Sequence, residues 1–459
     1  MPLSQKKLRT QAQACVKAVA IVTTGCLKNG RPADRTLAAL LRANRQFGSR
    51  DRRLISETLF AVLRWWGWLV RMLPRPPIDA AQEDGAGPLQ DMHMTEKEAH
   101  LWSKLCLAAC LLENAELPPA ADIWAETSGI PPEAIRNIDN RDQPECCAAT
   151  LCLMFNEKRE CGDFSLARLV PDWVPAEIPN PLPMNTLIEW LQKRPPVWLR
   201  IQNGKVESAN VLTEMADAGL KPKPHPVCRT AVHVTRPRIN LRTLDCFRAG
   251  NIEVQDLASQ AIGMICAPNP GERWWDACAG AGGKSLELAC LMQRKGTVVA
   301  SDIRDYKLDD LQKRARRAGL PNIRRKKWNG KAQPKQNRSF DGVLVDAPCT
   351  CSGTWRRNPE ARWTTGQDEV EEMRAVQSDI LRNTADAVRS GGVLVYATCS
   401  MFTRENHAVV YDFLADRPDF ELLPFTHPLT REHCDGTVQI WPWEGDCDAM
   451  FAARMRRIR

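Results

Sequence analysis

Apolar residues recur at spacings of three and four along the first 75 residues, which is the period of an amphipathic helix. The pattern predicts three helices, at residues 8–27, 33–46 and 49–73, and Ser49 and Asp51 are suitable caps for the third. Proline and glycine interrupt it at residues 75–88, and further helical patterns extend to about residue 156. We therefore expect an all-helical domain over residues 1–165.

The pattern becomes mixed after a proline-rich connector at residues 174–183, VPAEIPNPLP. It predicts a helix (NTLIEWLQKR), a strand (VWLRIQ), a second helix (ESANVLTEMADAG) and then short strands. Residues 184–250 are therefore expected to form a small α+β domain.

Strands and helices alternate regularly from residue 251 to the C-terminus. The expected strands are residues 273–280, 296–302, 340–348, 391–399, 438–443 and 448–457, and the expected helices are residues 282–295, 307–319, 369–390 and 405–417. This alternation is typical of the α/β class with a doubly wound, mostly parallel sheet. We expect it to form one domain over residues 251–459.

Composition narrows the class of protein. The chain has 459 residues and 18 cysteines, yet no CxxC pair and no histidine spacing typical of metal sites, so we expect no metal and mostly buried thiols. No run of apolar residues is long enough to span a membrane, and the polar N-terminus lacks a signal core. We expect a cytoplasmic monomer.

The net charge of +8 is unevenly distributed. Residues 1–80 contain 15 Lys/Arg and 4 Asp/Glu, a balance of +11, whereas residues 81–180 contain 7 and 18, a balance of −11. A basic N-terminal region favours a polyanionic partner, most simply nucleic acid. The basic clusters at 314–317 and 324–327 fit either an RNA track or a solvated face.

Two features at predicted strand ends suggest a nucleoside-bearing cofactor. The turn from Asp276 to Lys284 contains Gly280, Gly282 and Gly283, which let the backbone approach a ligand at a helix N-terminus. A tight structural turn would explain the glycines equally well. Asp302 ends the following strand, where an acidic residue typically binds a ribose diol.

Two cysteine turns at the next strand ends complete a specific set of motifs. In order they read VQDLASQAIG (254–263), DACAGAGGKS (276–285), DAPCTCSGTWRRNPEARW (346–363) and YATCSMFTREN (396–406). With these motifs, residues 184–459 resemble the Sun/Fmu (RsmB-like) family of RNA cytosine-carbon-5 methyltransferases. The helical front looks, more loosely, like the NusB-type RNA-binding domain of bacterial members, and the resemblance implies that residues 184–250 would help to shape a cleft for RNA.

The resemblance implies a Rossmann-like class I fold, S-adenosylmethionine as cofactor, and a site built from two cysteines. Cys399 would be the nucleophile, Cys349 would assist release of the product, and Asp346 would hydrogen-bond the cytosine ring. The cofactor would lie against Cys278, Ala279, Gly280, Ala281, Gly282, Gly283, Lys284, Asp302, Asn329 and Asp346. Arg356 and Arg357 would contact RNA phosphates, or instead cap the local helix or pair with Glu360.

Some positions depart from the family pattern. Ala281 stands where proline is usual, Cys351 where glycine is usual, Asn329 where an aspartate contacts the adenine, and Thr403-Arg404 where Pro-Glu is usual. Cys351 reads as a spare thiol or as an oxidation-prone partner of Cys349. None of the departures removes a catalytic residue, so we expect an active enzyme.

The expected function is methylation of cytosine at carbon 5 in small-subunit ribosomal RNA. Transfer RNA is an alternative substrate, and a non-catalytic ribosome-assembly factor that uses the same basic surface is a second class. A dinucleotide oxidoreductase is disfavoured, because the chain lacks GxGxxG and has paired cysteine turns.

Overall fold

The computed structural model describes residues 4–73, 89, 93–138, 141–155, 162–202, 204, 207–235, 239–331 and 339–459. Its chain contacts divide it into two compact units. The helical unit comprises residues 1–176, 183–193 and 355–365, and the methyltransferase-like unit comprises residues 177–182, 194–354 and 366–459. The predicted break at residues 75–88, which contains proline and glycine, lies outside the described residues.

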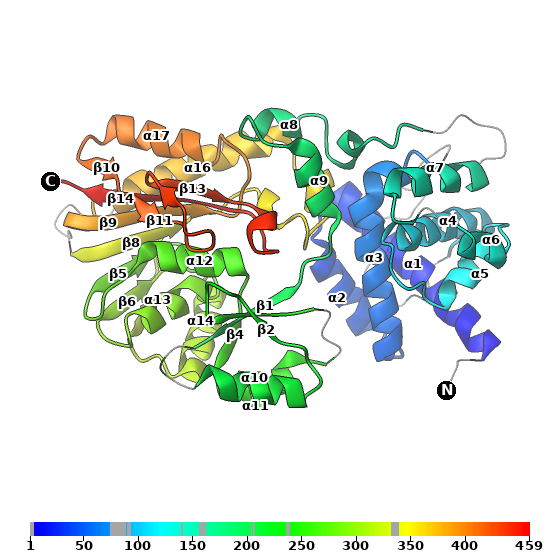
Figure 1. Ribbon diagram of the computed structural model, residues 1–459, viewed down its shortest axis with the longest axis horizontal. Helices are drawn as coiled ribbons and strands as arrows, with labels where there is room; N and C mark the ends of the chain where they lie inside the picture. The colour runs from blue at the N-terminus through cyan, green and yellow to red at the C-terminus, as the bar shows by residue number, and fades with distance from the viewer. Residues whose placement is uncertain are drawn as a thin grey trace. The chain divides into compact units, whose positions relative to one another are not determined.

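The blue and cyan helices of Figure 1 make up most of the helical unit. Its helices are α1 (Gln5–Asn29), α2 (Ala33–Ala43), α3 (Ser49–Leu69), α4 (Glu96–Leu112), α5 (Ala120–Thr127), α6 (Pro132–Arg136), α7 (Pro144–Phe155), α9 (Met184–Gln192) and α15 (Ala361–Thr364), with a 3₁₀ turn at Leu166–Leu169 and a short α8 (Val174–Glu177). Asp51 does act at the start of α3, because its carboxylate accepts the Gly48 amide proton (2.9 Å). No helix of the described ranges is both long and apolar enough to cross a bilayer.

The segment Trp355–Thr365 packs with the helical unit, although it follows the Cys349 turn directly in sequence. Close approach at Gly67 of α3 makes this packing specific: a β-carbon there would lie 2.0 Å from the Arg168 carbonyl and 2.6 Å from the Trp363 ring. The Trp363 indole also donates to the Leu63 carbonyl (2.7 Å).

A four-stranded antiparallel sheet begins the methyltransferase-like unit, in the order β2-β3-β1-β4. Its elements are β1 (Val197–Ile201), α10 (Ser208–Asp217), β2 (Lys223–Pro224), β3 (Ala231–Val234), α11 (Asp245–Arg248) and β4 (Ile252–Val254). Its last strand, β4, lies beyond residue 250, where the sequence analysis begins the next domain. Short strands of this kind carry little periodicity of their own.

The main sheet has eight strands in the order β10-β14-β9-β8-β5-β6-β7, with β13 paired to β14. Its strands are β5 (Arg273–Asp276), β6 (Thr297–Ala300), β7 (Ile323–Arg325), β8 (Phe340–Asp346), β9 (Val388–Thr398), β10 (Phe420–Leu422), β13 (Thr437–Ile440) and β14 (Met450–Arg457); β11 (Phe425–Thr426) and β12 (His433–Cys434) form a separate pair. The strands from β7 to β9 are parallel, and β14 is antiparallel.

Helices cover both faces of this sheet (Figure 1). They are α12 (Leu257–Cys266) and α13 (Gly283–Leu291) on one face, with α14 (Asp305–Ala318) beside them, and α16 (Gln367–Ala385) and α17 (His407–Asp416) on the other. Two buried apolar clusters fill the two interfaces, one centred on Leu286, Leu344 and Val395 and the other on Val345, Tyr396 and Val410. The doubly wound α/β class predicted from sequence is confirmed.

Candidate active site

The predicted site residues gather where the sheet changes its winding direction. From β5 the chain winds outward through β6 to β7, whereas β8 and β9 lie on the other side of β5. Parallel registers place Asp276 beside Leu344 and Ala300, and Asp346 beside Ala397. The carboxyl ends of these strands therefore form one edge, the place where open α/β sheets bind ligands.

The turn after β5 is open on its ligand side and packed behind. Gly280 (φ +52°) and Gly282 (φ +88°) have left-handed backbones. A β-carbon added at Gly280 or Gly283 would meet no atom within 4 Å, whereas one at Gly282 would lie 2.6 Å from Leu311. Gly280 and Gly283 thus leave a cradle beside the backbone, and Gly282 is required for packing against α14.

Asp276 is buried beneath this turn. It accepts a hydrogen bond from the Ser285 hydroxyl (2.6 Å), and its other oxygen has no partner among the described residues. Burial raises the pKa of Asp276 to about 7, and the bond from Ser285 only partly opposes that rise.

Asp302 follows β6 and is 4% exposed. Its carboxylate accepts the amide protons of Gly280 (2.9 Å) and Arg304 (2.8 Å) and pairs with the Arg304 guanidinium (2.9 Å). Burial alone would raise the pKa of Asp302, but the bonds from Arg304 and Gly280 outweigh it and hold the pKa below its ordinary value. The carboxylate therefore stays ionised and fixed to the glycine turn.

These residues fit a nucleoside-bearing cofactor. The cradle beside Gly280 and Gly283 leaves space for a ligand against the backbone, and the ionised Asp302 at the next strand end supplies acceptors for a ribose diol. Cys278 is half-buried in the same turn, and burial raises the pKa of its thiol, so it contributes backbone rather than a reactive sulfur.

Lys284 connects the cofactor turn to the cysteine turns. Its ammonium lies 2.7 Å from a carboxylate oxygen of Asp346. Burial lowers the pKa of Lys284, but the carboxylate of Asp346 more than offsets it, so the pKa is raised overall. The same positive charge acts on Cys399 and favours its thiolate.

The two predicted catalytic cysteines meet. The sulfurs of Cys349 and Cys399 lie 3.4 Å apart, although 50 residues separate them in sequence. The hydrogen bond with Cys349 lowers the pKa of Cys399, but the bond with Cys351 and burial raise it overall. The pKa of Cys349 is raised by its bonds with Cys351 and Cys399. In such a group one thiolate forms first, hydrogen-bonded by the remaining thiols.

A residue without a predicted role holds the two cysteine turns together. Glu405, fully buried, accepts the amide and hydroxyl protons of Thr350 (2.9 and 2.6 Å) from the first turn and the Ser400 hydroxyl proton from the second. Gln377 of α16 adds an amide proton (2.9 Å). In the sequence, the signal of this clamp is the Glu405-Asn406 pair that ends the motif YATCSMFTREN (396–406).

The predicted adenine contact, Asn329, follows β7 at the edge of the main sheet. Asn329 is exposed, and its side-chain oxygen accepts the Lys331 amide proton (3.2 Å). Trp328 is buried, donates to the Lys331 carbonyl (2.8 Å) and packs edge-on against Trp275. Trp328 is therefore a core residue, whereas the Asn329 side chain faces solvent.

The two arginines predicted to contact RNA lie in the segment that packs with the helical unit. Arg356 is 1% exposed, donates to the Lys193 carbonyl (3.1 Å) and lies 5.3 Å from the Trp190 ring centre. This burial favours the structural alternative for Arg356. Arg357 is half-buried, and its phosphate contact stays a prediction. Nearby Arg362 is also buried and donates to main-chain carbonyls, including that of Leu169 (2.9 Å).

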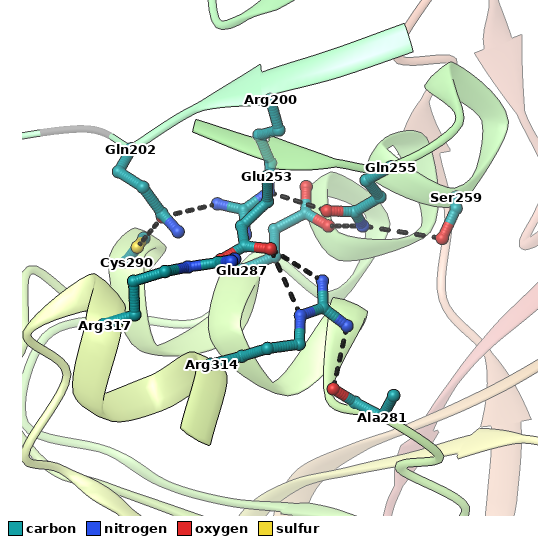
Figure 2. Close-up of polar contacts among 10 residues, drawn as sticks. All are labelled: Arg200, Gln202, Glu253, Gln255, Ser259, Ala281, Glu287, Cys290, Arg314 and Arg317. Carbon is teal, nitrogen blue, oxygen red and sulfur yellow. Dashed lines mark hydrogen bonds and ion pairs between the residues drawn. The ribbon is translucent and has the colours of Figure 1, made fainter. Parts of the chain in front are cut away.

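A buried polar cluster supports the cofactor turn from behind (Figure 2). Glu253 of β4 pairs with Arg314 (2.9 Å) and Arg317 of α14, and Arg314 also donates to the Ala281 carbonyl (2.8 Å). Next to them, Arg200 of β1 donates to Gln255 (2.7 Å). Glu253 of the small sheet is thus connected to the cofactor turn through Arg314, a link that no motif revealed.

Two parts of the chain match known protein families. Residues 263–456 match the model of the 16S rRNA methyltransferases RsmB/F, and residues 170–240 match the RsmF/B-like ferredoxin-like domain. The chain is 33% identical over 269 residues to the probable ribosomal RNA small subunit methyltransferase B of Bacillus subtilis (strain 168), which covers 56% of this chain and 59% of that relative.

A second relative aligns over most of its length. The ribosomal RNA small subunit methyltransferase B of Salmonella paratyphi B is 28% identical over 429 residues, covering 91% of this chain and 92% of the relative. The crystal structure of PH0851 has a TM-score of 0.74 over 100% of both chains, at 22% identity, and so shares the fold. Methyltransferases of the matched family depend on S-adenosylmethionine, the cofactor expected from the sequence.

Proposed function

Because its residues 263–456 belong to the RsmB/F family of ribosomal RNA methyltransferases, we propose that this chain methylates carbon 5 of a cytosine in small-subunit ribosomal RNA. The observation that carries the proposal is the 3.4 Å separation of the Cys349 and Cys399 sulfurs beside the Lys284–Asp346 pair. Two thiols at neighbouring strand ends are arranged to act in turn on one ring.

Carbon 5 of cytosine is a weak nucleophile, so the enzyme must first activate the ring. The Cys399 thiolate adds to carbon 6, forming a carbon–sulfur bond and leaving carbon 5 enamine-like. Lys284 favours the thiolate through its charge. Asp346, at the end of β8, hydrogen-bonds the ring and stabilises the charge that develops during addition.

The second half of the reaction removes a proton and breaks the carbon–sulfur bond. S-adenosylmethionine, when bound to the glycine turn and Asp302, supplies the methyl group that carbon 5 accepts. Cys349, deprotonated to its thiolate, then takes the carbon-5 proton, directly or through water, and later releases it to solvent. The electron pair of the broken carbon–hydrogen bond expels the Cys399 thiolate. The thiolate is regenerated for the next turnover.

The nucleobase must leave its stack to reach these sulfurs. A ring stacked in a duplex exposes only its edges, whereas addition at carbon 6 needs access to a face of the ring. We expect the target cytosine to lie in a loop or to be flipped out.

Two substitutions test the mechanism. Cys399→Ala should abolish methyl transfer to small-subunit ribosomal RNA while RNA binding persists, because only the bond-forming sulfur is lost. Cys349→Ala should accumulate a covalent protein–RNA adduct, because methylation proceeds but release does not. Denaturing gel electrophoresis with labelled RNA and labelled S-adenosylmethionine measures both results.

The two variants also control each other. Full turnover by Cys399→Ala would exclude it as the nucleophile, and an adduct in Cys399→Ala but not in Cys349→Ala would mean that the two roles are exchanged. Bisulfite sequencing of ribosomal and transfer RNA from a deletion strain would identify the modified molecule. Loss of a mark in transfer RNA alone would overturn the ribosomal assignment.

A further inference from the structure

A third thiol stands beside the two that the proposed reaction uses. The sulfurs of Cys349, Cys351 and Cys399 all lie within 4.8 Å of one another. Cys351 occupies a left-handed backbone position (φ +58°), where glycine would be unstrained, and its side chain is exposed. No step of the proposed reaction requires this sulfur.

The spacing of the three sulfurs matches that of thiolates around a metal ion. A tetrahedral zinc ion with bonds of about 2.3 Å holds its sulfurs about 3.8 Å apart. The cluster has one pair at 3.4 Å and the others within 4.8 Å, so small side-chain rotations suffice. Cysteine and histidine spacing along the chain predicts no metal, because this cluster joins turns that lie 50 residues apart.

The surroundings leave the three sulfurs accessible and held in place. The exposed Cys351 leaves an approach from solvent, and the clamp at Glu405 fixes both turns in advance. A preformed, accessible set of soft sulfur ligands selects thiophilic d¹⁰ ions.

We propose that Cys349, Cys351 and Cys399 together form a binding site for a thiophilic d¹⁰ cation such as Zn²⁺, and that its binding blocks methyl transfer. Each thiol that coordinates the ion releases its proton to solvent, and no oxidation or reduction occurs. Water completes the fourth position. The blocking part of the inference rests on the proposed function, whereas ion binding does not.

Cadmium, which gives an ultraviolet charge-transfer band for each bound thiolate, is the probe for the site. The reduced, metal-free full-length protein is titrated with Cd²⁺ alone. We expect one tight equivalent whose absorbance corresponds to three thiolates in the wild type. Cys351→Gly, which suits the left-handed backbone, should lose about one third of that absorbance and bind at least about tenfold more weakly.

Cys146→Ser is the matched control, because Cys146 is an exposed thiol of α7 in the helical unit. It should leave the titration unchanged. Identical Cd²⁺ titrations for Cys351→Gly and the wild type, or no saturable thiolate band in the wild type, would overturn the proposal.

Methyl-transfer assays test the blocking. Zn²⁺ should inhibit the wild type reversibly, with activity restored by a chelator, and Cys351→Gly should keep basal activity and need at least about tenfold more Zn²⁺ for the same inhibition. Equal sensitivity of the two proteins would contradict the blocking role. If neither protein transferred methyl groups, the proposed function would fail, while the cadmium titration would still decide the binding site.

Discussion

Two buried glutamates join separate segments of the methyltransferase-like unit, and they do so with different partners. Glu405 binds the cysteine turns through hydroxyl and amide groups, those of Thr350, Ser400 and Gln377. Glu253 binds α14 through two guanidiniums, those of Arg314 and Arg317 (Figure 2). The difference decides how each site tolerates a neutral replacement.

Hydroxyl groups can donate or accept a hydrogen bond, whereas guanidiniums can only donate. A glutamine at 405 could turn its amide nitrogen toward the hydroxyls of Thr350 and Ser400, which would then accept. A glutamine at 253 would direct its amide nitrogen at a guanidinium that cannot accept. The site of Glu405 can therefore accept a neutral amide, whereas the site of Glu253 requires a full carboxylate.

The largest effect should follow from removing the carboxylate of Glu405, which holds the two cysteine turns together. Glu405→Ala leaves Thr350 and Ser400 without their common acceptor, so the sulfurs of Cys349 and Cys399 lose their mutual position. We expect kcat to fall by about a hundredfold or more, because small misplacements of reacting groups are that costly. Single-turnover methylation assays measure the change.

Glu405→Gln is the matched variant. It should retain activity within about tenfold of the wild type, since the hydroxyls can reverse their bonds. An equal loss in both variants would show that the negative charge, and not the set of hydrogen bonds, positions the turns.

The supporting cluster should respond in the opposite way to the same chemical change. Glu253→Gln leaves Arg314 and Arg317 facing an amide, which we expect to cost about 3 kcal/mol of unfolding free energy. Because Arg314 also holds the Ala281 carbonyl, the KM for S-adenosylmethionine should rise about tenfold with little change in kcat. Urea unfolding and cofactor-dependent kinetics measure the two effects.

Arg317→Met separates stability from cofactor binding. Arg317 shares Glu253, and its guanidinium lies 4.1 Å from the Phe247 ring centre, whereas the bond to the Ala281 carbonyl comes from Arg314. This variant should lower stability while leaving the KM unchanged. A KM shift as large as that of Glu253→Gln would remove Arg314 from the explanation.

The catalytic edge was predictable because its signals are local. Strand, turn and helix follow one another within each motif, so Asp276, Asp302, Asp346 and both cysteines could be placed at strand ends from sequence. The carboxyl ends of neighbouring parallel strands then bring them together, whatever the distance along the chain.

The supporting cluster was not predictable, because its partners are distant and individually ordinary. Glu253 and Arg314 are 61 residues apart, and the 314–317 cluster was read as an RNA track or a solvated face. Helical spacing puts Arg314 and Arg317 on one side, toward Glu253, and leaves Arg316 exposed. In the same way, no pattern indicated that residues 355–365 pack with the helical unit.

A third buried glutamate extends the comparison to pH. Glu287 of α13 accepts a hydrogen bond from Gln255 (2.7 Å), and burial raises its pKa to about 7. The folded state then holds this proton more tightly than the unfolded state, so stability is full below about pH 4.5 and is lost as pH rises through 7. This titration lowers the free energy of unfolding by about 3 kcal/mol, and Glu287→Gln should abolish that decrease.

Urea unfolding at pH 5 and pH 8 measures how far the free energy of unfolding falls as pH rises. The variant should keep a smaller decrease, because buried Asp276, whose pKa is also about 7, titrates in the same direction. An unchanged difference between the two pH values would mean that Glu287 is already ionised in the folded protein at pH 5.

The smallest effect should come from the exposed edge of the site, where water competes with every contact. Asn329 stands where the family resemblance predicts an adenine-binding aspartate, and its side chain is exposed and bonded to the Lys331 amide. Asn329→Asp supplies a charged acceptor, and charge-assisted bonds exceed neutral ones by about 1 kcal/mol before solvent screening. We therefore expect the KM for S-adenosylmethionine to fall only about threefold, with kcat unchanged.

Asn329→Ala should raise the KM by a similar factor, because the acceptor is lost. Equal KM values in all three proteins would place the adenine away from residue 329. The contacts that fix the cofactor would then lie at the buried ends of β5 and β6, where hydrogen bonds already hold Asp302 against the glycine turn.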